Sequence, residues 1–275
     1  MPASSLPASQ AARPLALITG ASSGIGAVFA RRLAPTHDLL LVARRTERLA
    51  ALGIELQGTA ECRVEVWTAD LGVHSEVARL AERIASDPRL ALVVNNAGFG
   101  LSGAFWEGRL ADLETMQRLH IDATLALCHA ALRNFVPRNA GAIINVASVA
   151  AFIRGAGSGT YAATKAWMTS FTEGLYLDLR QADSQVVVQA LCPGFTYSEF
   201  HDVMGIDRRS RAPLSFWLTA ESVVAASLEG LEARTLYVIP GWRYRLLTAV
   251  IGILPHSLRL SFESARKRSK TNSPK

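Results

Sequence analysis

The chain has 275 residues, and 49% of them are hydrophobic, a fraction that can build a sizeable core and excludes a largely disordered protein. This length suits one large α/β domain or two small ones. The formal net charge is +6 at pH 7. Because part of it belongs to a basic tail, the charge does not require a nucleic-acid function, and we expect none. The tail consists of Arg266, Lys267, Arg268, Lys270 and Lys275.

The cysteine and histidine patterns predict no metal or redox motif. Cys62, Cys128 and Cys192 are far apart and odd in number, which indicates a reducing compartment, and we expect the cytoplasm. The histidines do not cluster. Residues 1–13 lack the charged start and apolar centre of a secretory signal and are typical of a disordered arm. No run approaches the ~20 apolar residues of a membrane-spanning helix, and the nearest is Leu246–Leu254.

The first predicted elements are a buried strand over Leu15–Ile18, a glycine-rich turn and a helix that begins near Ile25. This order is typical of a pyrophosphate site, because free N–H groups and the positive end of the helix dipole face the anion. Gly20 allows the tight turn, Gly24 lets phosphate approach the backbone, and Gly26 lets helix and strand pack closely. The spacing Gly-x-x-x-Gly-x-Gly differs from the Gly-x-Gly-x-x-Gly fingerprint, yet we expect a bound cofactor. Its expected contacts here are Gly20, Ser22, Ser23, Gly24, Ile25 and Gly26.

A second buried strand over Asp38–Ala43 leads directly into Arg44 and Arg45. In a dinucleotide fold, an acidic residue near this point would hold the adenine ribose hydroxyls. A guanidinium instead forks onto the oxygens of a 2′-phosphate, so we favour NADP(H) over NAD(H), with both arginines among the contacts. The alternative is a pair of solvated surface arginines that open the helix Thr46–Gln57.

Strands and helices alternate along the rest of the chain. Further strands are predicted over Cys62–Trp67, Leu90–Val94, Ala142–Ala147, Gln185–Leu191 and Thr235–Ile239. Further helices are predicted over Ser75–Ser86 with Ser75 as N-cap, Leu110–Phe135 ending near Pro137, Thr160–Arg180, and Glu221–Glu232. This alternation predicts an α/β fold with a parallel, doubly wound sheet, whose ligands lie at the carboxyl ends of the strands. Gly20, Arg44, Asp70 and Asn96 all fall at such ends.

Tyr161 and Lys165 are four residues apart on a predicted helix, so they share a face. We expect the lysine cation to lower the tyrosine pKa and make the phenol a usable acid or base. Ser148, at the end of the preceding strand, can donate to the same substrate oxygen. Together these groups suit reduction of a carbonyl, with hydride from a nicotinamide and a proton from Tyr161. The alternative for the tyrosine and lysine alone is an ordinary exposed helix face.

From about Leu15 to Phe200, with a looser continuation to Gly241, the chain resembles the short-chain dehydrogenase/reductase family. The motifs that carry the resemblance are Thr19–Gly26, Asp70-Leu71, Asn95–Gly98, Ser148, Tyr161–Lys165 and Pro193-Gly194. The resemblance implies a single Rossmann-type domain over residues 14–241, with a seven-stranded parallel sheet and NAD(P)-dependent alcohol/carbonyl chemistry. It implies a small carbonyl or alcohol substrate, and we expect a homodimer or homotetramer.

The resemblance also implies a role for each motif. Tyr161 would be the catalytic acid/base, Ser148 would polarise the substrate, and Lys165 would bind the nicotinamide ribose. The remaining implied cofactor contacts are Asp70 and Leu71 at the adenine, Asn96, Ala97 and Gly98 along the adenosine, and Pro193, Gly194 and Thr196 at the nicotinamide amide.

One position departs from the family pattern. Members usually carry an asparagine before the serine strand, where it completes a water-mediated proton relay. The matching residue here is Asp122. A backbone carbonyl can fill the role from aspartate too, but a buried charge near Lys165 would alter the titration of the tyrosine–lysine pair.

Two segments at the C-terminal side have alternative interpretations. Residues 200–219 lie where the family places its substrate lid, and they combine apolar area with arginines. They fit either an apolar pocket with an anionic handle or simple packing beside a solvated basic loop. Residues 242–275 mix basic and apolar residues at helical spacing. This pattern fits peripheral membrane contact, the lining of an apolar substrate entry, or packing on the domain or against a second subunit. For the whole chain, the alternative to a reductase is a non-catalytic NAD(P)-binding sensor or scaffold.

Overall fold

The computed structural model of the protein describes residues 13–199, 214–255 and 257–258. The strands are β1 Leu15–Thr19, β2 Asp38–Ala43, β3 Val64–Thr68, β4 Leu90–Asn95, β5 Ala142–Val146, β6 Val187–Leu191 and β7 Tyr237–Val238. The helices are α1 Gly24–Leu33, α2 Thr46–Thr59, α3 His74–Ala85, α4 Leu110–Gln117, α5 Ala123–Arg138, α6 Gly159–Gln181, α9 Ala220–Glu232 and α10 Trp242–Ile253. Most of the expected N-terminal arm, most of the expected lid and the basic tail lie outside the described residues.

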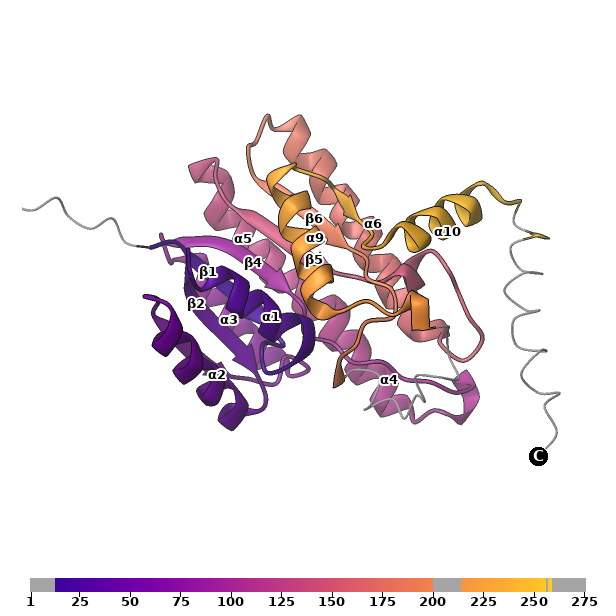
Figure 1. The fold of residues 1–275 in the computed structure, drawn as a ribbon, viewed down its shortest axis with the longest axis horizontal. Helices are drawn as coiled ribbons and strands as arrows, with labels where there is room; N and C mark the ends of the chain where they lie inside the picture. Colours follow the sequence, from indigo (N-terminus) through magenta and orange to yellow (C-terminus); the bar gives the residue numbers. More distant parts are fainter. Residues whose placement is uncertain (1–12, 200–213, 256, 259–275) are drawn as a thin grey trace, which may run out of the picture.

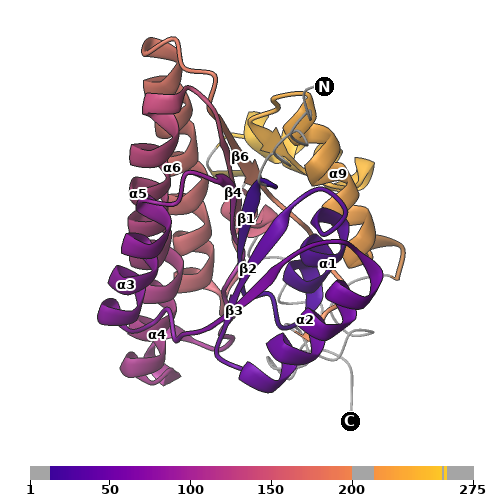
Figure 2. The same ribbon diagram turned by 90° about the vertical axis from the view of Figure 1, so that its left-hand side faces the viewer.

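The seven strands form one parallel sheet in the order β3-β2-β1-β4-β5-β6-β7. Figure 2 shows this sheet between two layers of helices, with α3, α5 and α6 on one face and α1, α2 and α9 on the other. The predicted α/β, doubly wound fold is therefore confirmed. The order reverses between β1 and β4, which is where such folds bind ligands.

The two largest apolar clusters of the core lie one on each face of the sheet, and β1 contributes to both. Leu15 and Leu17 pack into the layer under α3 and α5, whereas Ala16 and Ile18 pack into the layer under α1. Successive side chains of a strand point to opposite faces, so a central strand covered on both sides must be apolar at every position. All five residues of β1 are buried.

Two details of the predicted helices are wrong. Ser75 is not an N-cap, because α3 begins at His74 with Val73 as its N-cap residue. The predicted continuous helix after β4 is divided by a π-helical turn, Arg118–Asp122, between α4 and α5. As expected, α5 ends near Pro137, at Arg138, and it is followed by Asn139 in a left-handed conformation. A proline has no N–H to donate, but near a helix end this removes one hydrogen bond and does not break the helix.

α10 lies at one end of the molecule, beyond β6 and α6 (Figure 1). Its Tyr244, Thr248 and Ile251 are buried against the domain, which favours packing for this part of the segment, whereas Trp242 and Ile253 are exposed. Among the residues that the structure describes, no helix is both long and apolar enough to cross a bilayer.

Candidate active site

The glycine turn between β1 and α1 forms one side of the candidate site. Gly20 and Gly24 have φ angles of 67° and 54°, in the left-handed region that favours glycine. A Cβ on Gly26 would lie 2.4 Å from the carbonyl oxygen of Gly20, so the helix approaches the turn as closely as only glycine permits. Ile25 is partly buried against the core. The N-cap residue Ser23 makes no side-chain hydrogen bond to α1. The N–H groups in the first turn of α1 are therefore not capped by Ser23, and they suit an anion.

Asn96, directly after β4, joins a second turn to the glycine turn. Its side-chain amide donates to the carbonyl oxygen of Thr19 at 2.8 Å and to that of Gly20 at 3.3 Å. In return, the N–H groups of Asn96 and Ala97 each donate to the Thr19 hydroxyl at 2.9 Å. The Asn95–Gly98 turn and the glycine turn, which are far apart in sequence, are thus held against each other.

The two arginines after β2 have different surroundings. Arg44 is largely exposed, and its Nη1 lies 4.0 Å from Oδ2 of Asp70. Arg45 donates from Nη2 to the hydroxyls of Ser22 at 2.9 Å and Ser23 at 2.8 Å. Arg45 is therefore tied to the glycine turn, whereas Arg44 remains largely solvated.

Asp70 and Leu71 follow β3 but present different groups. A side-chain oxygen of Asp70 accepts from the N–H of Gly72 at 2.9 Å, and the carboxylate is half-exposed. Leu71 is buried in the core layer under α3 and α5. Its side chain is therefore turned into the core, and a ligand at this edge would meet the backbone of Leu71.

Ser148, Tyr161 and Lys165 meet where β5 ends and α6 begins. A side-chain hydrogen bond joins Ser148 to Tyr161. Nζ of Lys165 lies 5.9 Å from the centroid of the Tyr161 ring and donates to the carbonyl oxygen of Val146 at 2.8 Å. The four-residue spacing on α6 and the strand end thus bring all three predicted side chains together.

Burial controls the titration of this group. It raises the pKa of Tyr161 to about 12, although the hydrogen bond with Ser148 acts in the opposite direction. It lowers the pKa of Lys165 to about 8. The expected lowering of the tyrosine pKa is therefore wrong for this structure, because desolvation of the phenolate outweighs its stabilisation.

His120 was not predicted as a site residue, yet it connects the turn after β4 to α6, the helix that carries Tyr161 and Lys165. Its Nε2 accepts from the N–H of Phe99 at 3.3 Å, and its Nδ1 lies 2.9 Å from the hydroxyl of Thr164. That hydroxyl donates to the carbonyl oxygen of Tyr161, so Nδ1 carries the proton and the imidazole is neutral. Burial, together with the charge of Lys165, lowers the pKa of His120 well below its usual value. Only its proximity in sequence to Asp122 could have drawn attention to it.

Asp122 ends the π-helical turn, and its side chain is exposed. It is therefore not the buried charge that would perturb Lys165. The ammonium of Lys165 instead donates to the carbonyl oxygen of Val146. A relay through Asp122 would have to use its backbone.

The loop after β6 closes the other side of the site. The N–H of Val149 donates to the carbonyl oxygen of Pro193 at 3.0 Å. Because Val149 directly follows Ser148 in the sequence, this hydrogen bond holds the loop next to Ser148. The hydroxyl of Thr196 donates to the carbonyl oxygen of Gly194 at 3.0 Å. A Cβ on Gly194 would lie 2.0 Å from the Tyr244 ring, so glycine is required for α10 to pack here.

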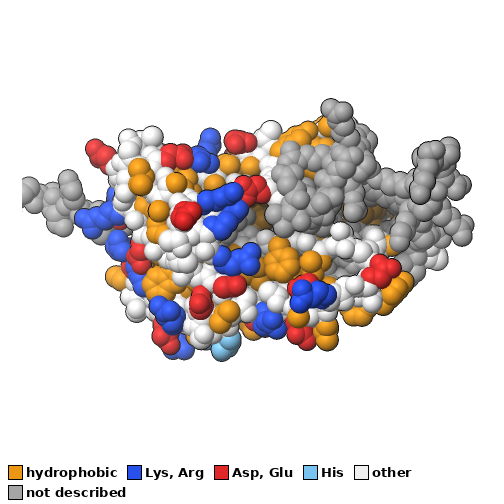
Figure 3. Space-filling view, turned by 90° about the horizontal axis from the view of Figure 1, so that it is seen from below, with side chains coloured by type: hydrophobic (Ala, Val, Ile, Leu, Met, Phe, Trp, Pro, Cys, Tyr) orange, Lys and Arg blue, Asp and Glu red, His pale blue; other side chains and the backbone are white. Residues whose placement is uncertain are grey.

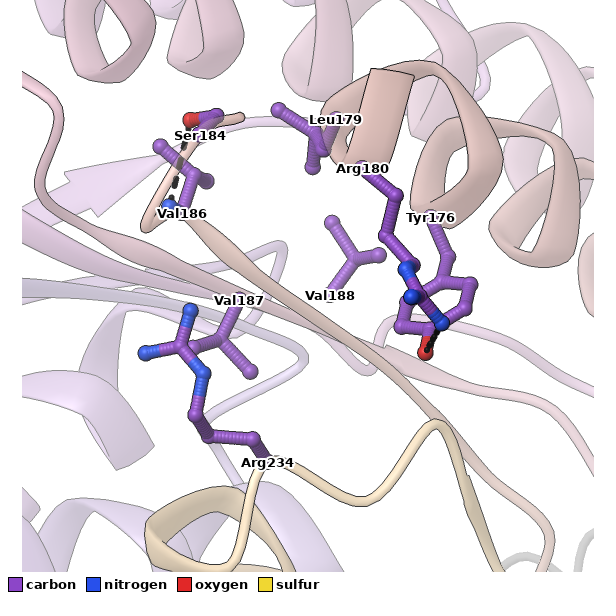
Figure 4. A pocket seen from close by; sticks show the side chains of 8 residues that line it. All are labelled: Tyr176, Leu179, Arg180, Ser184, Val186, Val187, Val188 and Arg234. Carbon is purple, nitrogen blue, oxygen red and sulfur yellow. Dashed lines mark hydrogen bonds between the residues drawn. The ribbon is translucent and has the colours of Figure 1, made fainter. Parts of the chain in front are cut away.

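A separate pocket of about 190 Å³ lies at the start of β6 and the end of α6 (Figure 4). Ser148 follows the carboxyl end of β5, whereas this pocket includes Val187 at the opposite end of the neighbouring parallel strand. The pocket is therefore not part of the candidate active site.

The underside of the molecule in Figure 1 is shown in Figure 3. On the described part of this face, Lys and Arg side chains are interspersed with Asp and Glu. The charge is thus mixed there, unlike the basic patch or stripe that is typical of nucleic-acid-binding proteins. The absence of a nucleic-acid partner stays a prediction.

Comparisons with known proteins connect this geometry to a family. A family model described as short chain dehydrogenase matches residues 14–208. Sulfoacetaldehyde reductase 2 of Chromohalobacter salexigens is 38% identical over 192 residues, which cover 68% of this chain and 74% of the relative.

Solved structures match over nearly the whole chain. A short-chain dehydrogenase from Sphingobium yanoikuyae in complex with NADPH has a TM-score of 0.78 and 33% identity, over 95% of this chain and 97% of that chain. The bulky-bulky ketone specific alcohol dehydrogenase from Comamonas testosteroni has a TM-score of 0.73 and 29% identity, over 95% of each chain. A short chain dehydrogenase/reductase from Burkholderia phymatum in complex with NAD has a TM-score of 0.74 and 25% identity, over 91% and 95%.

Proposed function

Because this chain belongs to the short-chain dehydrogenase family and is a dehydrogenase/reductase acting on CH–OH or C=O groups, we propose that it reduces a ketone or aldehyde with NADPH, using Tyr161 as the proton donor. The observation that carries the proposal is the hydrogen bond between Ser148 and Tyr161, with the Lys165 ammonium beside the phenol ring. These groups lie at the same edge of the sheet as the glycine turn.

The residues at that edge fit a dinucleotide phosphate. The close approach at Gly26 and the left-handed Gly20 and Gly24 leave backbone rather than side chains at the turn. Arg44 and Arg45 supply positive charge at the end of β2, where the 2′-phosphate of NADPH would be held. Matched structures carry NADPH in one case and NAD in another, so the preference for NADPH rests on these two arginines.

The bound nicotinamide would supply the hydride to the substrate carbon. Tyr161, with a pKa of about 12, is protonated at neutral pH, which is the form that can donate to the oxygen as negative charge develops. The Ser148 hydroxyl shares that oxygen and stabilises its charge. Lys165, held by the Val146 carbonyl, stabilises the phenolate that remains after proton transfer.

The proposal is tested by following NADPH oxidation against ketones, aldehydes, sugars, steroids and acyl thioesters, with NADH in parallel. In Tyr161→Phe we expect kcat to fall about 10²- to 10⁴-fold, whereas the Kd for NADPH stays within about twofold. The matched control is Tyr176→Phe, on the same helix but hydrogen-bonded only to Arg180 in the contacts described, which should keep wild-type kcat.

Equal loss of turnover and NADPH binding in Tyr161→Phe would contradict the proton-donor role. Wild-type protein that binds NADPH but reduces none of the compounds would favour the sensor or scaffold. A preference for NADH in kcat/KM would contradict the cofactor assignment.

A further inference from the structure

A carboxylate from the loop after β6 reaches the arginines at the start of α2. Glu199 Oε2 lies 2.8 Å from Nη1 of Arg45, and its Oε1 lies 2.5 Å from Nη1 of Arg48. Arg45 uses Nη2 on the hydroxyls of Ser22 and Ser23 at 2.9 and 2.8 Å. One carboxylate, two guanidiniums and two hydroxyls thus form a single polar cluster beside the glycine turn.

The segment Phe195–Glu199 connects this cluster to the nicotinamide side of the proposed site. It begins two residues after Pro193, whose carbonyl accepts from the loop that follows Ser148. The Cβ of Ser198 lies 3.1 Å from the position that a Cβ on Gly24 would occupy. The segment therefore passes against the glycine turn before its last residue reaches Arg45.

Glu199 binds Arg45, one of the two arginines assigned to the 2′-phosphate in the proposed function. Its hydrogen bonds with Arg45 and Arg48 lower the pKa of Glu199, so the carboxylate is ionised at neutral pH. A phosphate monoester carries about −1.5 to −2 charges at pH 7. Two anions on one guanidinium repel each other at a separation of a few ångströms. NADH has no 2′-phosphate, so its binding does not create this conflict.

We propose that Glu199 competes with the 2′-phosphate of NADPH for Arg45 and so limits the preference for NADPH over NADH. This inference rests on the proposed function, because it takes Arg45 as part of the 2′-phosphate site. Glu199 then acts on specificity through an arginine and takes no part in the transfer of hydride or proton.

The test compares the Kd values for NADPH and NADH in wild type, Glu199→Gln and Glu47→Gln. Glu199→Gln removes the negative charge but keeps the side-chain length. Glu47 lies in the first turn of α2, beside the same arginines in sequence, and is exposed, so its variant controls for net charge. Adenosine 2′,5′-bisphosphate and adenosine 5′-monophosphate serve as probes that lack the nicotinamide.

We expect Glu199→Gln to bind NADPH and the bisphosphate about two- to tenfold more tightly, with NADH and the monophosphate within twofold of wild type. Glu47→Gln should change the ratio of the two Kd values by less than twofold. An unchanged NADPH/NADH ratio in Glu199→Gln, or weaker NADPH binding, would overturn the competition while leaving the reductase proposal intact. Wild-type protein that binds neither dinucleotide would overturn both.

Discussion

His120 makes the stability of the fold depend on pH in a specific range. The imidazole is fully buried, accepts at Nε2 from the Phe99 N–H and carries its proton on Nδ1 beside Thr164. Protonation would turn Nε2 into a donor that faces another donor, and it would bury a cation near Lys165. The folded state therefore disfavours the charged form, and acidification should destabilise it.

Proton linkage gives the direction and the size of the effect of pH on the free energy of unfolding. The pKa of His120 is lowered in the folded protein, so between that value and the unfolded value of about 6.5 only the unfolded chain takes up the proton. Stability from this group is complete above about pH 6.5 and falls as the pH drops below it. Each pH unit in that window costs about 1.4 kcal/mol. Carboxylates with lowered pKa lose their contribution only near their own unfolded values, about pH 4.

The assay is urea unfolding followed by tryptophan fluorescence between pH 5 and pH 8. His120→Asn, which keeps an N–H near the Nδ1 position, should lose stability at pH 8 because the Phe99 N–H loses its acceptor. The dependence of the free energy of unfolding on pH below about 6.5 should also become weaker, by the slope that corresponds to about one proton taken up on unfolding. His37 also has a pKa lowered mainly by burial, so His37→Asn measures its share. An acid slope that persists in His120→Asn but disappears in His37→Asn would refute the assignment.

Two further predictions concern the close contact at Gly26 and the buried hydroxyl of Tyr244. Gly26→Ala should lower the free energy of unfolding by about 1–3 kcal/mol and weaken NADPH binding at least about tenfold, because the new Cβ would lie 2.4 Å from the carbonyl oxygen of Gly20. Calorimetry and titration measure these effects, and Gly58→Ala is the control because nothing lies within 4 Å of its Cβ. Equal behaviour of the two variants would contradict the reasoning. Tyr244→Phe should lower the free energy of unfolding in urea by about 1–3 kcal/mol, because the buried hydroxyl accepts from the N–H of Phe195 at 2.9 Å and donates to a backbone carbonyl at 2.8 Å. A loss below about 0.5 kcal/mol would show that water replaces both hydrogen bonds.

The sequence was sufficient for the architecture because its signals are local. An apolar run such as Leu15–Ile18, followed by glycines and a helical pattern, leaves few other structures. Alternation of strands and helices then requires parallel pairing, which gathers the strand ends at one edge. The four-residue spacing of Tyr161 and Lys165 placed them on one helix face, and Ser148 joined them through the end of β5.

The pKa values and side-chain pairings at the site depend on residues that are far apart in the sequence, so only the tertiary structure shows them. The spacing of Tyr161 and Lys165 indicates that a cation is near a phenol, but only the fold shows that burial raises the tyrosine pKa. His120 contacts Thr164 because α6 packs against the π-helical turn, and it contacts Phe99 through the turn after β4. Glu199 and Arg45 are 154 residues apart, and no local pattern reports a pairing over that distance. Backbone conformation is encoded mainly by short-range preferences, so the sequence alone determined the sheet and the edge at which the site lies. Desolvation and charge pairing depend on the surroundings that folding brings together, so the fold determined how the side chains at that edge titrate and pair.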